Sequence, residues 1–122
     1  MIEITLLGEP KSTQTIYKVT CRGNFGSLYM SKDGKDIKEH YTLQARSQVK
    51  IKPYIGFLTV KMRIFMGTKR KSDIDNFNKL CFDSLTGIAW EDDSQIVELN
   101  IVKGYCKENP RIELDIYELP MC

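Results

Sequence analysis

Two short acidic segments carry the residue types best suited to chemistry in this chain. Asp73 and Asp75 lie two positions apart, and Asp92 and Asp93 are adjacent. Mg²⁺ prefers oxygen ligands and keeps several of its waters, so two to four carboxylates are an adequate contribution from a protein. If folding brings the two segments together, their carboxylates can hold one or two divalent cations.

Basic residues accompany the acidic pairs. Lys79 follows Asp75 by four residues, which is about one helical turn and places the two on one face of a helix. An ammonium group there can offset the charge that grows on a phosphate during hydrolysis. The run Lys69, Arg70 and Lys71 comes just before the first acidic pair and is suited to hold a phosphate backbone beside the cation.

Each of these features also has a simpler structural explanation. Ser72 and Asp75 fit a helix capping box, Asp73 suits the positive end of a helix dipole, and Asp75 with Lys79 forms an ordinary ion-pair spacing. Four aspartates, a lysine and a tribasic run within 25 residues nevertheless favour function. The combination predicts metal-dependent phosphodiester hydrolysis or phosphoryl transfer.

Composition narrows the class of protein further. The 122 residues, with a net charge of +2 and 42% hydrophobic residues, predict one soluble globular domain over residues 1–122. No apolar run is long enough to span a membrane, and the N-terminus lacks the basic residues of a signal peptide. Four cysteines without a C-x-x-C pair and a single histidine argue against a zinc site of the usual spacing.

Charge is distributed unevenly along the chain. Residues 1–71 carry 14 Lys and Arg against 5 Asp and Glu, whereas residues 72–122 carry 4 against 11. This asymmetry indicates a surface for a polyanion in the first part and a concentration of carboxylates in the second.

Hydrophobic periodicity predicts the elements that must position these residues. Alternating apolar residues predict strands, apolar residues every three or four positions predict helices, and the polar segment 11–31 reads as a long loop or a loose hairpin. The predicted strands are 1–7, 57–66, 96–103 and 111–119, and the helices begin at Asp33 or Asp36 and near residue 73, ending before Pro53 and near Gly87. This order predicts an α+β domain whose mixed sheet is packed by two main helices.

Segments 73–79, 82–87 and 90–96 resemble the RusA-type Holliday-junction resolvases. That family combines a basic run with the patterns D-(I/L)-D-N-x-x-K, D-(A/S)-L and D-D-(S/A)-Q-(I/V), and the match covers about residues 68–98. The resemblance implies that Asp73, Asp75 and Asp93 are the essential metal-binding carboxylates and that Asp92 belongs to the same acidic pocket. It also places Lys79 on the family's catalytic lysine.

The resemblance further implies a small bacterial or phage-encoded homodimer that acts in the cytoplasm in DNA recombination and repair. Such an enzyme cuts two opposing strands of a four-way DNA junction with Mg²⁺, or Mn²⁺ in its place, and needs no organic cofactor. The apolar face of 58–66 or that of 97–101 is a candidate dimer interface only if the helices do not already cover it. Basic residues expected to contact the DNA are Lys69, Arg70, Lys71, Lys11, Lys18 and Arg22.

Two alternatives share these features. A nuclease for flaps, forks or plain duplex would use the same metal site. A non-catalytic DNA-binding protein would need only the basic first part, with the aspartates acting as helix and turn caps.

Overall fold

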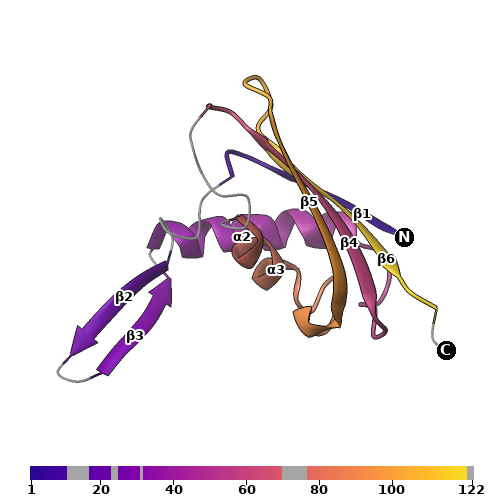
Figure 1. The fold of residues 1–122 in the computed structure, drawn as a ribbon, viewed down its shortest axis with the longest axis horizontal. Coiled ribbons are helices and arrows are strands. Elements are labelled where there is room, and N and C mark those ends of the chain that lie inside the picture. The colour runs from indigo at the N-terminus through magenta and orange to yellow at the C-terminus, as the bar shows by residue number, and fades with distance from the viewer. Residues whose placement is uncertain (11–16, 23–24, 31, 70–76, 121–122) are drawn as a thin grey trace.

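The computed structural model describes residues 1–10, 17–22, 25–30, 32–69 and 77–120. Figure 1 shows a main sheet with two helices on one side and a separate hairpin that projects from the beginning of the longer helix. The described elements, in chain order, are β1 (Ile2–Leu7), β2 (Tyr17–Arg22), β3 (Phe25–Met30), α2 (Lys32–Gln48), β4 (Leu58–Met66), α3 (Asn78–Leu85), η2 (Asp93–Gln95, a short 3-10 helix), β5 (Ile96–Tyr105) and β6 (Arg111–Glu118).

The main sheet is mixed, as predicted. Its strand order is β1-β6-β4-β5, so β1 and β5 form the two edges. β6 is antiparallel to both of its neighbours, whereas β4 and β5 are parallel and are connected through α3. The α+β fold class with two main helices is therefore confirmed.

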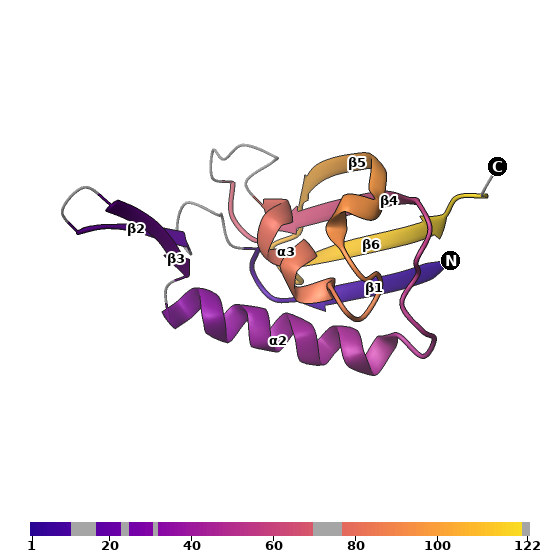
Figure 2. The ribbon, with the colours of Figure 1, turned by 90° about the horizontal axis from the view of Figure 1, so that it is seen from below.

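Strict alternation in the strands builds the core. In β4 every second residue from Leu58 to Met66 is buried, and β1 and β6 alternate in the same way. α2 contributes Tyr41 and Ala45 from a stripe that recurs every four residues. Figure 2 shows α2 and α3 lying across the same face of the sheet. Burial of each such apolar side chain contributes about 1.5–3 kcal/mol, so this single interface accounts for much of the stability.

The other face of the sheet is polar. Arg63 of β4 donates to Glu113 and to Asp115 of β6, each at 2.9 Å, and Arg111 donates to the second oxygen of Glu113 at 2.9 Å. The Arg111 guanidinium also lies 4.1 Å from the centre of the Phe65 ring. This ladder of alternating charges crosses the two central strands and leaves the face solvated.

The edge at β1 is closed by side chains of α2. Gln48 accepts a hydrogen bond from the Thr5 N–H at 2.8 Å and donates to the Thr5 carbonyl at 2.7 Å. Gln44 makes the same pair with Leu7, at 2.7 and 3.3 Å. Two side-chain amides thus take the place that a further strand would occupy.

Several predicted boundaries differ from the structure. Segment 11–31 contains the two paired strands β2 and β3, so the hairpin interpretation is correct and the loop interpretation is wrong. α2 begins at Lys32, which places Asp33 and Asp36 inside the helix and not at its cap. β5 runs two residues beyond the predicted end, to Tyr105.

The predicted start of the second helix, near residue 73, lies outside the described residues. Within the described residues, α3 begins at Asn78. α3 ends at Leu85, and Gly87 follows with a positive φ of 89°, a conformation in which glycine carries no Cβ penalty.

In the part of the chain that the structure describes, neither helix combines the length and the apolar character needed to cross a membrane.

Candidate active site

The acidic turn, which we define as residues 91–95, lies directly before β5. It follows Trp90, a residue of the core. Trp90 is fully buried, its indole N–H donates to the Thr86 hydroxyl at 3.2 Å, and its ring meets Phe82 edge-on with centroids 5.6 Å apart. The next residues, Asp92 and Asp93, are exposed. A fixed aromatic anchor therefore presents two carboxylates to solvent, where a large substrate can reach them.

Ser94 holds the Asp92 carboxylate in its ionised form. Its hydroxyl donates to the Asp92 carboxylate at 2.8 Å. The pKa of Asp92 is lowered, first by this hydroxyl, then by the Ser94 backbone N–H. Hydrogen bonds to a charged carboxylate favour that charged form, so Asp92 is an anion over the physiological range.

Asp93 has the opposite tendency. Its pKa is raised, first because partial loss of solvent penalises the charged form, and then because of the neighbouring carboxylates of Asp92 and Asp83. Like charges that crowd together disfavour ionisation, and a bound cation relieves this repulsion. The acidic turn therefore has the electrostatic character expected of a cation site.

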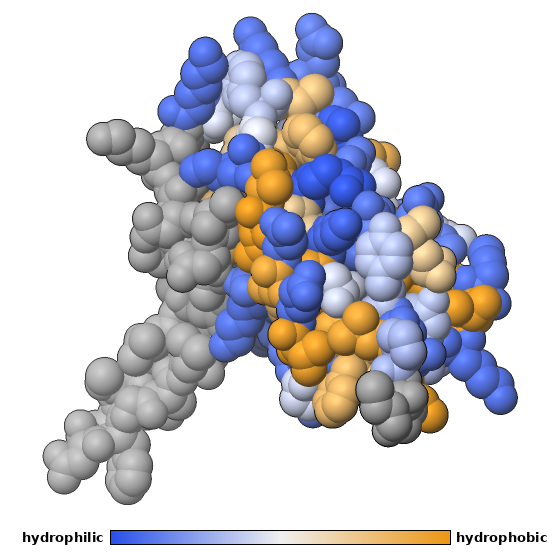
Figure 3. Space-filling view, turned by 45° about the vertical axis from the view of Figure 1, so that its right-hand side comes forward, coloured by the Kyte–Doolittle hydropathy of each residue, from blue (hydrophilic) through white to orange (hydrophobic). Residues whose placement is uncertain are grey.

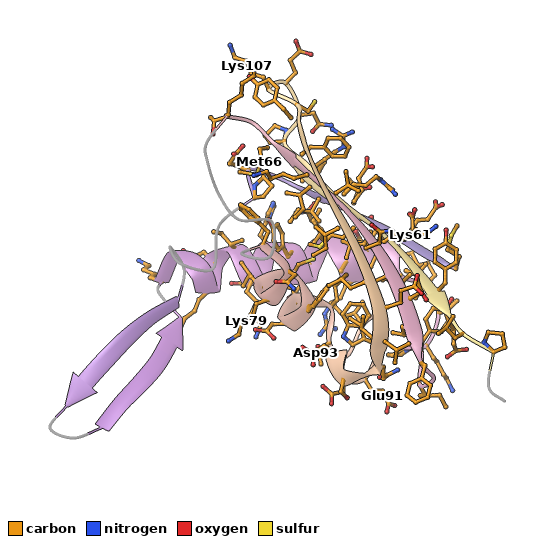
Figure 4. The ribbon with its side chains drawn as sticks, viewed as in Figure 1. Lys61, Met66, Lys79, Glu91, Asp93 and Lys107 are labelled. Carbon is orange, nitrogen blue, oxygen red and sulfur yellow. The ribbon has the colours of Figure 1, made fainter. Side chains whose placement is uncertain are left out.

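Asp83 of α3 lies near the acidic turn. The sequence interpretation did not assign Asp83 to the site. It lies four residues after Lys79, one helical turn along α3, and it contributes to the negative potential at Asp93. The signal was present in the sequence as this i,i+4 spacing. Figure 4 shows Lys79 on α3 and Asp93 on the turn that precedes β5. Both Figures 1 and 2 place that turn beside α3.

Lys69 lies at the other end of β5. Its ammonium group is 5.4 Å from the centre of the Tyr105 ring, at the last residue of the strand, whereas Asp93 precedes the first. The nine steps from Ile96 to Tyr105 at roughly 3.3 Å each correspond to about 30 Å. Lys69 therefore lies far along β5 from the acidic turn, and its contact with DNA stays a prediction.

Several predicted site residues lie outside the described residues: Asp73, Asp75, Arg70, Lys71 and Lys11. Lys18 and Arg22 belong to β2, on the hairpin that projects from the beginning of α2, and only their backbone is described. The gathering of the two acidic pairs into one pocket therefore stays a prediction.

The described carboxylates fit a divalent cation as part of a larger ligand set. Asp92 and Asp93 supply hard oxygen donors, the type that Mg²⁺ and Mn²⁺ prefer. Among the described residues, no group of three or more His, Cys, Asp or Glu side chains is close enough to hold a metal ion. A complete site would need further ligands, for which the predicted Asp73 and Asp75 are the candidates.

The remaining described residues with reactive side chains have other roles. Cys81 is fully buried, and this burial raises the pKa of its thiol, so it is a poor nucleophile. His40 is exposed on α2.

Comparison with known proteins identifies the class of this chain. A family model described as endodeoxyribonuclease RusA matches residues 8–117. A crossover junction endodeoxyribonuclease RusA of Shigella sonnei is 33% identical over 102 residues, which cover 80% of this chain and 82% of that protein. The corresponding Escherichia coli K12 protein is 34% identical, and that of Enterobacteria phage 82 is 32% identical, over the same shares.

The class of protein is therefore a nuclease that cuts DNA internally. More particularly, the chain belongs to the RusA family of endodeoxyribonucleases. The resemblance found in residues 68–98 is confirmed, and the alternative of a non-catalytic DNA-binding protein is not supported. Residues 8–117 contain both predicted acidic pairs, so the match includes the whole candidate site.

Proposed function

We propose that this endonuclease resolves four-way DNA junctions by two symmetric cuts, in DNA recombination and repair in the cytoplasm of a bacterium. The names of its relatives, crossover junction endodeoxyribonucleases from bacteria and a phage, carry this proposal. The exposed acidic turn supports it, because a bulky branched substrate needs an open site. Residues 1–122 would form one domain that contains all parts of the site.

Asp73, Asp75, Asp92 and Asp93 are the proposed ligands of Mg²⁺, with Mn²⁺ as a substitute. The bound cation would polarise the scissile phosphate and lower the pKa of a coordinated water. Ionised Asp92, held by Ser94, would attract the cation, and a bound cation would offset the repulsion between the carboxylates of Asp92 and Asp93. We assign the essential carboxylates to Asp73, Asp75 and Asp93.

Lys79 is the proposed electrostatic partner of the reacting phosphate. It is exposed on the first turn of α3, the helix beside which the acidic turn lies. A fixed ammonium stabilises the extra negative charge of the transition state more than that of the ground state. Replacing Lys79 by alanine should therefore reduce turnover more than affinity for the junction.

The basic residues Lys69, Arg70, Lys71, Lys11, Lys18 and Arg22 are proposed to bind the phosphate backbone. Because Lys69 is about 30 Å of strand away from Asp93, it would contact the DNA at a distance from the cut. Such contacts position the junction arms without reading their sequence.

A homodimer would match the symmetry of paired cuts, and β5 is the proposed interface. The apolar face of 58–66 is excluded as an interface because Leu58, Met62 and Met66 are covered by the helices. At the edge strand β5, Val97, Leu99 and Val102 are 55%, 37% and 58% exposed. The register shift between Leu58 and Thr59 leaves Val97 outside the pairing with β4, whereas Leu99 and Val102 are paired with Val60 and Arg63. Figure 3 shows that hydrophobic side chains, in orange, lie among hydrophilic ones on this side of the described surface.

A cleavage assay tests the proposal. A synthetic four-way junction, a flap, a fork and a plain duplex of the same sequence are incubated with the protein in Mg²⁺ and in EDTA. We expect paired symmetric cuts in the junction with Mg²⁺ alone, and junction binding without cleavage in EDTA. Preferred cleavage of the flap or fork would instead identify another branched substrate, and equal cleavage of all four would contradict structure-specific activity.

A further inference from the structure

Gln95, the last residue of η2, uses its whole side-chain amide in hydrogen bonds. Its Oε1 accepts from the backbone N–H groups of Glu91 and Asp92, each at 2.9 Å. Its Nε2 donates to the carbonyls of Tyr54 at 2.8 Å and Gly56 at 2.9 Å. Both donors and both acceptor lone pairs of the amide are therefore occupied.

The segment that receives Gln95 is itself firmly held. The Tyr54 N–H donates to the Ala89 carbonyl at 2.9 Å, just before buried Trp90. The Gly56 N–H donates to the Glu118 carboxylate at 3.2 Å, at the end of β6. Through Gln95, the acidic turn is thus attached to the loop after α3 and to a central strand of the sheet.

Closing the turn alone would not require glutamine. In a capping box, the side chain at the third position only accepts hydrogen bonds from the start of the turn, which glutamate does equally well. The donor half of Gln95 reaches residues 41 and 39 positions earlier in the chain. Only an amide satisfies both the turn and these two distant carbonyls.

We propose that Gln95 is a positioning residue for the metal site: its amide locks the acidic turn onto Tyr54 and Gly56 and so fixes where Asp92 and Asp93 present their carboxylates. This inference rests on the proposed function of those two carboxylates as metal ligands. Replacing residues that orient metal ligands through hydrogen bonds typically lowers metal affinity or activity by about 10–100-fold. Without the lock, each bound cation would have to order an exposed turn.

The primary test compares Gln95→Met with the double variant Gln44→Met/Gln48→Met. The double variant also loses four hydrogen bonds between glutamine amides and the backbone, but at β1. Binding of Mn²⁺ to the DNA-free protein is followed by electron paramagnetic resonance, and stability by thermal unfolding. We expect Gln95→Met to bind Mn²⁺ about 10-fold or more weakly, and the double variant to bind it like the wild type. Equal Mn²⁺ affinity in Gln95→Met and the wild type would overturn the inference, as would equal losses in both variants.

Gln95→Glu separates anchoring from charge. Glutamate keeps the acceptor half but cannot donate to the two carbonyls, and it adds a negative charge near the acidic turn. Charge alone predicts tighter Mn²⁺ binding, whereas loss of the anchor predicts weaker binding. Weaker binding would support the anchor, and binding equal to or tighter than that of the wild type would contradict it.

Amide hydrogen exchange in the wild type tests the lock if a variant fails to fold. The N–H groups of Glu91 and Asp92 should exchange more slowly than their intrinsic rates, although both residues are exposed. Exchange at the intrinsic rate would contradict the inference. Wild-type protein that neither binds Mn²⁺ nor cleaves DNA would refute the proposed function, whereas an active wild type with an equally active Gln95→Met would refute only the role of Gln95.

Discussion

At both edges of the main sheet, glutamine amides form hydrogen bonds to the backbone, but with different consequences. At β1, the amides of Gln44 and Gln48 pair with the backbone of the edge strand and close it. At β5, the amide of Gln95 pairs with backbone before the strand begins, holding the acidic turn, while the strand pairs with β4 alone in the main sheet. The β1 edge is thereby protected against further pairing, and the β5 edge carries the candidate site and stays available to a partner.

This difference shows how a small α+β domain can separate stability from function. Exposed edge strands are liable to pair with other chains, and natural proteins usually cover them. In the described part of the main sheet, the side chains of α2 close the edge at β1, whereas β5 pairs with β4 on one side only. We therefore expect substitutions at β5 to change cleavage, metal binding and association, and substitutions at β1 to change the free energy of unfolding.

The largest expected effect is the loss of cleavage in Asp93→Asn. The substitution removes a proposed metal ligand, so Mg²⁺-dependent junction cleavage should fall by more than about 100-fold, beyond the effect of residues that only support ligands. Junction binding in EDTA should be unchanged or stronger, because one negative charge near the DNA is removed. Gel-based cleavage and binding assays measure both.

The control for Asp93→Asn is Glu91→Gln, which removes an exposed carboxylate from the same turn. It should cleave at nearly the wild-type rate. If both variants lose activity equally, the general negative potential of the turn matters and Asp93 has no special role.

The second effect concerns association. Val102→Glu places a charge on exposed β5, and Leu7→Glu places one on β1 at a residue that is 50% exposed. If β5 forms the dimer interface, Val102→Glu should raise the dissociation constant of the dimer by at least about 10-fold. A 10-fold change corresponds to about 1.4 kcal/mol. Leu7→Glu should leave it intact. Sedimentation equilibrium distinguishes them, and a wild type that is monomeric at micromolar concentration would contradict the dimer.

The third effect is on stability alone. Gln44→Met/Gln48→Met removes four hydrogen bonds between α2 and β1, and should lower the free energy of unfolding by about 1–3 kcal/mol, because solvent replaces part of each bond. Urea titration followed by circular dichroism gives this value. Cleavage per folded molecule should be unchanged, and a large loss of cleavage would show that the two edges are coupled.

The smallest expected effect is on stability, at Glu113 of the central strand β6. The pKa of Glu113 is lowered, first by Arg111 and then by Arg63. A carboxylate whose pKa is lower in the folded state stabilises the protein above its unfolded pKa, and this contribution disappears as the pH falls through the folded pKa. Glu113→Gln should therefore lower the free energy of unfolding by less than about 1 kcal/mol at pH 7, since the ion pairs are partly exposed. The difference from the wild type should shrink as the pH is lowered below about 4, and urea titrations at several pH values test it.

Local patterns were sufficient to predict much of the fold. Alternation in 57–66 and 111–119 predicts strands because successive side chains point to opposite faces, and the structure buries every second residue of β4 and β6. The recurrence of apolar residues every four positions through Ile37, Tyr41 and Ala45 predicts the stripe that α2 packs against the core equally well. These features depend on a few neighbouring residues, so they can be read from the chain alone.

Long-range features were harder to predict. Exposure of Val97 depends on the register shift opposite it in β4, and Asp83 contributes to the site only because α3 packs beside the acidic turn. Lys69 follows the end of β4, and β5 runs parallel to β4, so Lys69 lies beside the end of β5 and far along that strand from Asp93. The spacing of residues in the sequence did not indicate this position.

By itself, the sequence determined the residue types of the site, their spacing and the family to which the chain belongs, because these depend on the chemistry of short segments. The tertiary structure decided which sheet edge is closed, where Lys69 lies and what Gln95 holds. Those facts arise from hydrogen bonds between residues about 40 positions apart, and their geometry exists only after the strands have found their order in the sheet.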